Sequence, residues 1–159
     1  MSADAEKALK TSLRRSAMDY LARREHSRTE LFDKLLRKYP EQESLLSPVL
    51  DHLEQDNLLS DDRFTEAYIR YRRNRGFGPL LIQQELRGKG VSNALLDVHL
   101  DSRDPVWRES LLALVERKSR GVVDLHKDIK ARQKLFRFCL SRGFSAEQIG
   151  RALRGDFAL

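Results

Sequence analysis

The sequence is poor in the residues that build disulfides, turns and membrane spans. Its 159 residues include one cysteine, four prolines and eight glycines. A single cysteine excludes an internal disulfide and a cysteine-based zinc cluster. No apolar run approaches the roughly 20 residues that cross a bilayer, and Met1–Lys10 lacks the apolar stretch of a secretory signal. We therefore expect a cytoplasmic protein without a membrane segment, and not a turn-rich β-sandwich.

Charged residues, in contrast, are abundant. They make up 34% of the chain, against roughly 25% in typical soluble domains. The formal net charge is +6 and the sequence pI is about 9.7. High charge with little glycine and proline favours solvent-facing helices, and the modest basic excess indicates a nucleic acid or an acidic partner.

Apolar residues recur at helical spacing along almost the whole chain. They predict nine helices and therefore an all-α fold. Ser27 with Glu30 and Ser145 with Gln148 have the spacing of capping boxes at helix starts. Ser47-Pro48 has the form of an N-cap followed by proline at the first helical position, and predicts a helix start there.

The clearest amphipathic helix is expected after Ser60-Asp61-Asp62, where a cap and two acids suit the positive end of a helix dipole. Its expected apolar face repeats at i, i+3, i+4 and i+7. That face consists of Phe64, Ala67, Tyr68 and Tyr71.

Shifted copies of the chain align with one another. An offset of 51 residues places Leu31 on Ile82, and a further offset of 53 places Lys89-Gly90-Val91 on Arg142-Gly143-Phe144. We interpret this as tandem repeats of three helices each. Units this small bury little surface alone, so we expect an elongated, curved helical array with a long face for a linear partner. The three predicted repeats are residues 1–59, 60–103 and 104–159.

No catalytic constellation is visible in the sequence. It holds no Gly-x-x-x-x-Gly-Lys-Ser/Thr loop, and no Gly-x-Gly-x-x-Gly turn after a strand. Its four histidines are not paired at metal-ligand spacing. We therefore expect no catalytic, cofactor-binding or metal-binding residue, and a protein that is not an enzyme.

Three positions could carry chemistry, but each has a favoured structural interpretation. Asp61-Asp62 could bind a metal, although capping a helix suits their position better. Glu25-His26 could act as an acid and a base, although a cationic His26 is favoured at a helix end by the dipole. Cys139 falls on an apolar helix side, which predicts a small buried hydrophobe rather than a nucleophile.

The basic residues are unevenly distributed. Between Arg117 and Arg142 nine Lys and Arg face two Asp, a net charge of +7, so the rest of the chain carries −1. Four of the nine are spaced 3, 4 and 3 residues apart, which places them within about 80° of one helix face. The opposite side carries Leu135, Phe136, Cys139 and Leu140. The four cations, which we predict to bind a partner, are Lys127, Lys130, Lys134 and Arg137.

A second basic cluster closes the fourth expected helix. A helix dipole accounts for one or two cations at a C-terminus, but four occur within six residues. Arg75 shares the apolar side with Tyr71, so its stem is expected to lie along that side. Arg70, Arg72 and Arg73 are expected to fan outward, and we predict that they also bind the partner.

Four motifs in register resemble the RecX regulatory proteins of bacteria. They are Leu21–Leu31, Leu58–Phe64, Gly78–Val91 and Leu140–Ser145, and the resemblance spans the chain apart from its extreme ends. It implies three tandem three-helix repeats and a non-enzymatic modulator of the RecA recombinase. Such proteins are held to lodge along the RecA filament on single-stranded DNA, where they inhibit strand exchange, ATP hydrolysis and coprotease activity. The family offers no catalytic residues to carry over.

This sequence departs from the repeat pattern in its first unit, where Tyr39-Pro40 replaces the basic-Gly exit of the other two. We expect a monomer without cofactors, whose partners are the RecA filament and the single-stranded DNA within it. The alternative is a stand-alone helical DNA-binding protein that uses the same cationic helix faces.

Overall fold

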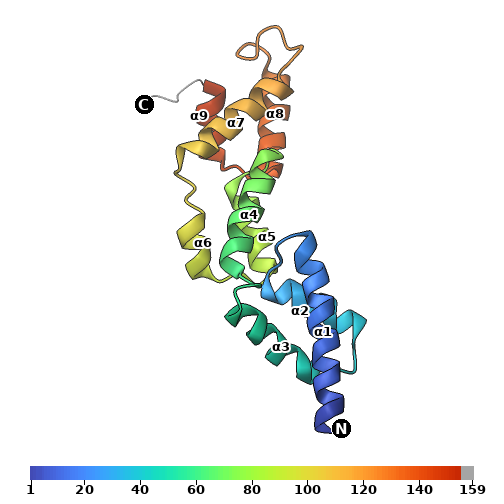
Figure 1. Cartoon of the computed structure of the whole chain (residues 1–159). Helices are drawn as coiled ribbons and strands as arrows, with labels where there is room; N and C mark the ends of the chain where they lie inside the picture. The colour runs from blue at the N-terminus through green and yellow to red at the C-terminus, as the bar shows by residue number, and fades with distance from the viewer. Residues whose placement is uncertain (155–159) are drawn as a thin grey trace. The chain divides into compact units, whose positions relative to one another are not determined.

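The computed structural model describes residues 1–154. Within that range every regular element is helical, which confirms the predicted all-α fold (Figure 1). The nine helices are α1 (Ala3–Arg23), α2 (Arg28–Lys38), α3 (Glu43–Gln55), α4 (Asp61–Asn74), α5 (Pro79–Gly88), α6 (Asn93–His99), α7 (Pro105–Lys118), α8 (Ile129–Ser141) and α9 (Ala146–Arg154).

The predicted caps begin these helices. Ser27 accepts a hydrogen bond from the backbone N–H of Glu30 at 3.1 Å. At α9 the capping box is complete, because Ser145 Oγ accepts from the Gln148 N–H and Gln148 Oε1 accepts from the Ser145 N–H, both at 3.1 Å. At α2 only half of the box forms, since the Glu30 carboxylate instead pairs with Arg24 at 2.9 Å.

The predicted helix start at Ser47-Pro48 is wrong. Helix α3 already begins at Glu43 and carries Pro48 in its interior. An interior proline costs about 3 kcal/mol. The extra first turn buries Leu45 and Leu46, which are 8% and 0% exposed, and burial of such side chains contributes about 1.5–3 kcal/mol each. Burial of the two leucines, about 3–6 kcal/mol together, is large enough to offset the cost of the proline.

The first three helices form a bundle. Helices α1, α2 and α3 pack on one another pairwise, as Figure 1 shows in blue to teal. Their apolar faces meet in one core, because each helix places leucines three or four residues apart on the inner side. The fully buried members include Leu13, Leu31, Leu35, Leu46, Leu50 and Leu53.

The last three helices form a second bundle. Helices α7, α8 and α9 also pack pairwise, around Trp107, Leu111, Leu135, Cys139 and Ile149. Overall the chain divides into two compact units. Unit 1 comprises residues 1–67 and 86–95, and unit 2 comprises residues 68–85 and 96 onward. The division passes through α4 and α5, so the predicted repeat limits at 59/60 and 103/104 stay predictions.

Within unit 1, the start of α2 is joined to the end of α5. The Ser27 hydroxyl donates to the backbone carbonyl of Lys89 at 2.8 Å. Gly90 follows with φ at +80°, and a Cβ there would lie 2.1 Å from Thr29 Oγ1. Only glycine combines this left-handed backbone with so close an approach.

Within unit 2, an equivalent joint connects the start of α5 to the end of α8. The Gly78 N–H donates to the carbonyl of Arg142 at 2.6 Å, and the Leu80 N–H donates to that of Gly143 at 3.0 Å. Gly143 has φ at +100°, and a Cβ on it would lie 2.4 Å from Leu81 Cβ. The two joints sit at corresponding repeat positions, which explains the shared basic-Gly exit.

The departure at Tyr39-Pro40 has a structural reason. Among the described residues, the end of α2 makes no such joint. Instead the Tyr39 hydroxyl shares a hydrogen bond of 2.7 Å with Ser16 of α1. Because no neighbouring helix start packs against this turn, the turn does not require glycine. The half-buried Tyr39 ring packs against the core of the first bundle.

Candidate nucleic-acid interface

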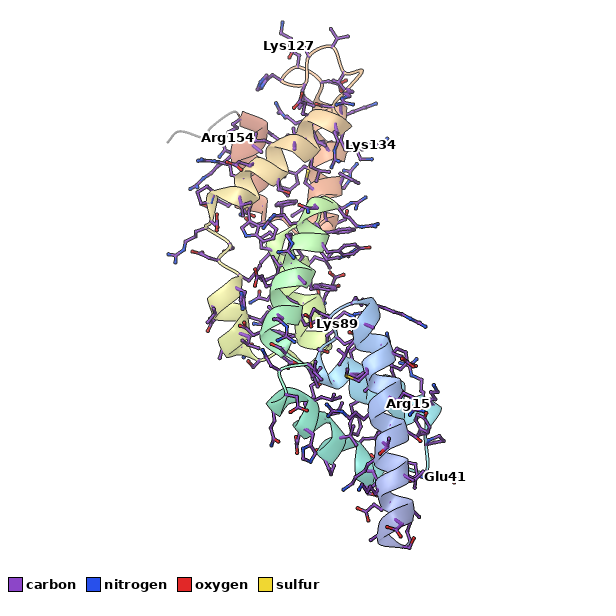
Figure 2. The ribbon with its side chains drawn as sticks, in the orientation of Figure 1. Arg15, Glu41, Lys89, Lys127, Lys134 and Arg154 are labelled. Carbon is purple, nitrogen blue, oxygen red and sulfur yellow. The ribbon has the colours of Figure 1, made fainter. Side chains whose placement is uncertain are left out.

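Helix α8 presents three of the predicted cations to solvent. Lys130, Lys134 and Arg137 are exposed, and within residues 1–154 they form no hydrogen bond or ion pair. Lys127, however, is not on the helix, because Asp128 caps α8 and Lys127 precedes it in a turn, 4.0 Å from Asp124. The predicted four-residue stripe is therefore a three-residue stripe, and Figure 2 shows Lys127 in the loop and Lys134 on the helix.

The opposite side of α8 is buried, but over a narrower arc than expected. Leu135 and Cys139 are 6% and 0% exposed, whereas Leu140 is 43% exposed. Burial raises the pKa of the Cys139 thiol to about 11, so the thiolate form needed for nucleophilic attack is scarce. The prediction of a structural cysteine is confirmed.

The predicted outward fan at the end of α4 is wrong for Arg72. Its Nε and Nη2 donate to the two carboxylate oxygens of Glu85 at 2.9 and 2.7 Å. Its guanidinium carbon lies 3.6 Å from the centroid of the Phe77 ring. Glu85 of α5 and the Phe77 ring therefore hold the Arg72 side chain against the protein. Of the other two arginines, Arg70 is exposed and Arg73 is half-buried.

Tyr71 also departs from expectation. Its spacing predicts a place on the buried face of α4, but the side chain is 54% exposed. The buried face is centred instead on Phe64, Thr65 and Ile69, which places Tyr71 at its edge. Thr65 can be buried because its hydroxyl donates to the Asp61 carbonyl at 2.7 Å.

The two basic clusters of the sequence meet on one surface of unit 2. The guanidinium carbon of Arg142 lies 4.7 Å from the centroid of the Phe77 ring and 4.9 Å from that of the Phe138 ring. The Nζ of Lys118 lies 4.6 Å from the centroid of the Phe138 ring. Cations at these distances are attracted by the ring faces. Together with Arg72, they form an alternating ladder from the end of α4 to α8.

We call this the cation–aromatic surface. The cations of this surface can be found in the sequence from the placement of charge. The aromatic rings cannot be found in that way, and the only sequence signal for them is that they lie between basic residues. The surface comprises Arg72, Phe77, Lys118, Phe138 and Arg142. Tyr71 and Arg75 lie beside Arg72 in the chain, and Lys130, Lys134 and Arg137 lie on α8, the helix that carries Phe138.

The candidate acid and metal positions have structural partners. Asp61 accepts a hydrogen bond from the Arg28 N–H at 2.7 Å, and burial raises the pKa of its carboxyl. In the described part of the chain, no group of three His, Cys, Asp or Glu side chains is arranged to hold a metal ion. None of the helices in that part is long and apolar enough to span a membrane.

The prediction of a cationic His26 is wrong. His26 is 1% exposed, and its Nε2 lies 2.8 Å from Lys34 Nζ. Burial, followed by the charges of Arg24 and Lys34, lowers the pKa of His26 despite a hydrogen bond to the Arg24 carbonyl. The neutral imidazole is a core group that accepts a hydrogen bond from the lysine.

Comparison with protein families identifies all three repeats in order. The first, second and third three-helix domains of RecX match residues 14–44, 60–100 and 108–153. The chain belongs to the RecX family. The second match begins at Ser60, the cap of α4, and the third ends within α9.

Curated relatives agree over most of the chain. It is 42% identical over 144 residues to the regulatory protein RecX of Pseudomonas entomophila, covering 91% of each chain. It is 40% identical to that of Pseudomonas fluorescens, with the same coverage. Both relatives carry the name regulatory protein RecX.

Solved RecX structures share the fold. A crystal structure of RecX from Lactobacillus salivarius superimposes with a TM-score of 0.75 at 24% identity, over 92% of this chain and 96% of that one. A second RecX crystal structure superimposes with a TM-score of 0.77 at 23% identity, over 93% of this chain and 73% of that one. At this identity the likeness concerns the fold alone.

Proposed function

We propose that the protein binds the RecA filament on single-stranded DNA and inhibits its strand exchange, ATP hydrolysis and coprotease activity. The observation that carries the proposal is the match to all three RecX domains, in order, over most of the chain. In this proposal it acts in the cytoplasm as a monomer, without catalysis.

The charge on unit 2 supports this proposal. Lys130, Lys134 and Arg137 project from α8 without internal partners among residues 1–154. Cations that are not neutralised within the protein gain most from phosphates or acidic side chains of a partner. Arg72 is bound to Glu85, so we assign it to shaping the surface. Arg70, Arg73 and Lys127 remain proposed contacts.

The direct test is RecA-catalysed ATP hydrolysis on single-stranded DNA. Increasing amounts of the protein are added, either to prebuilt filaments or before filament growth begins. We expect hydrolysis to fall at substoichiometric to stoichiometric ratios. No effect at any ratio in either order of addition would overturn the proposal.

The alternative function is stand-alone DNA binding. The exposed cations of α8 favour it, because positive charge without an internal partner attracts DNA phosphates without a second protein. It predicts binding to DNA in the absence of RecA that falls steeply with salt, about a thousandfold between 50 and 200 mM for some six duplex phosphate contacts. The alternative also predicts a preference for particular sequences, whereas a filament regulator needs none.

A further inference from the structure

One aromatic ring on unit 2 is unlike the others. Tyr71 is 54% exposed, whereas every other Phe, Tyr or Trp side chain in residues 1–154 is buried or half-buried. Exposing a ring of this size forgoes the free energy of burying it. Tyr71 is therefore a candidate for contact with a partner.

The Tyr71 ring is held from one side. Arg75, in the turn directly after α4, places its guanidinium carbon 4.5 Å from the ring centroid. A cation at this distance restrains the ring and adds positive charge beside it. Tyr71 also directly precedes Arg72, whose guanidinium begins the ladder through Phe77 and Arg142 to Phe138.

We propose that Tyr71 is a stacking platform for an unpaired base, with Arg75 and the cations of α8 holding the phosphates of the same strand. This inference rests on the proposed function, because it names the component of the filament that the surface contacts. The ligand class is single-stranded nucleic acid. An exposed ring flanked by cations matches the way in which non-specific single-strand binders combine stacking with phosphate contacts.

Stacking also sets the preference between single and double strands. In a duplex both faces of a base are covered by neighbouring base pairs, so Tyr71 cannot reach them. In a single strand any base offers a face, and the contact does not depend on sequence. The structure thus predicts selectivity for unpaired strands from one side chain, beyond the attraction of charge.

The test measures direct binding of fluorescently labelled oligonucleotides by anisotropy, without RecA, at fixed low salt. Tyr71→Ala is compared with Tyr71→Phe, which keeps the ring, and with Val98→Ala. Val98 is 74% exposed on α6 of the same unit and serves as the control. A second ligand is an abasic strand of equal length, which keeps the phosphates and lacks the bases.

We expect Tyr71→Ala to weaken binding to the normal strand by about fivefold to 150-fold, the range for losing one base–aromatic stack. Binding to the abasic strand and to duplex should change less than about twofold. Tyr71→Phe and Val98→Ala should behave as the unchanged protein. Circular dichroism and thermal melting establish that each variant is folded.

Three outcomes would overturn the inference. These are no binding of the unchanged protein to single strands, normal affinity of Tyr71→Ala, or an equal loss on the abasic strand, which would reduce the ring to a support for Arg75. The RecA assay is scored separately. If Tyr71→Ala binds strands normally but no longer inhibits RecA, Tyr71 contacts protein. If the unchanged protein binds strands but never inhibits RecA, only the proposed function fails.

Discussion

The Ser27 hydroxyl donates a hydrogen bond of 2.8 Å to the backbone carbonyl of Lys89, 62 residues away in the chain. The same oxygen accepts from the Glu30 N–H and so caps α2. One hydroxyl group therefore both starts a helix and ties it to the turn after α5. The Lys89 ammonium also forms an ion pair with Glu30, with 3.3 Å between Nζ and Oε2. This ion pair is a second link between α2 and the turn after α5.

Replacing Ser27 should cost more than replacing an ordinary cap. Ser27→Ala removes the cap, worth about 1 kcal/mol, and leaves the Lys89 carbonyl without its donor, worth about 1–3 kcal/mol more. Ser60 caps α4 with a similar 3.1 Å contact to the Arg63 N–H, so Ser60→Ala is the matched control. Urea denaturation should show the larger loss for Ser27→Ala, and equal losses would show that the tie to Lys89 contributes nothing.

Two neighbouring glycines should respond to alanine in opposite directions. Gly88 lies in α5, and a Cβ added to it would meet nothing within 4 Å, so Gly88→Ala should stabilise by about 0.5–1 kcal/mol. Gly90 has φ at +80° and Thr29 in the way, so Gly90→Ala should destabilise by at least about 1 kcal/mol from strain alone. Melting temperatures of the two variants check the signs, and a neutral Gly90→Ala would contradict the close joint.

The buried His26 should make the folded state sensitive to mild acid. Its pKa is lowered in the folded protein, so below pH about 6.5 the unfolded chain binds more protons. Stability should therefore fall as the pH drops below about 7, by about 1.4 kcal/mol for each unit by which the pKa is lowered. His26→Phe introduces the residue found at the corresponding repeat position, Phe77, and should flatten this dependence in urea titrations. If the free energy of unfolding of His26→Phe depends on pH as in the unchanged protein, other groups cause the dependence.

A second acid-sensitive group lies in the same joint. Burial of Glu30 disfavours its charged form, but Arg24 and then Lys89 outweigh this and lower its pKa to about 2. A lowered acid pKa stabilises the fold above the ordinary value near 4.5, and the contribution disappears as the pH falls from about 4.5 to about 2. Glu30→Gln should remove that component of acid unfolding, whereas Asp33→Asn, at an exposed position on α2, should not.

Much of the fold was predictable because local signals dominate it. Ser27, Ser60 and Ser145 cap helices as their spacing predicts, and the glycine exits mark the joints. Pro48 shows the limit, since its local preference for a helix start gives way to the burial of Leu45 and Leu46. That burial depends on α1 and α2 lying against α3, which no local pattern reports.

The surface was predictable only in part, for a similar reason. Exposure of Lys130, Lys134 and Arg137 follows from helix periodicity alone. The inward turn of Arg72 does not, because Glu85 lies 13 residues further along the chain. Nor does the meeting of the two basic clusters, which requires Arg142, beside Phe138 at the end of α8, to reach Phe77 across a tertiary contact. Charge placement follows from the sequence, but the pairing of charges needs the fold.

The central claim is that the exposed cations of α8 engage the RecA filament. It is tested by ATP hydrolysis of RecA on single-stranded DNA with the triple variant Lys130→Glu, Lys134→Glu and Arg137→Glu. The control carries the same change of charge at exposed residues of α1, namely Lys7→Glu, Arg15→Glu and Arg23→Glu. We expect the α8 variant to lose inhibition while folded, and the α1 variant to retain it. Full inhibition by the α8 variant would contradict the account and reduce that face to ordinary solvated surface.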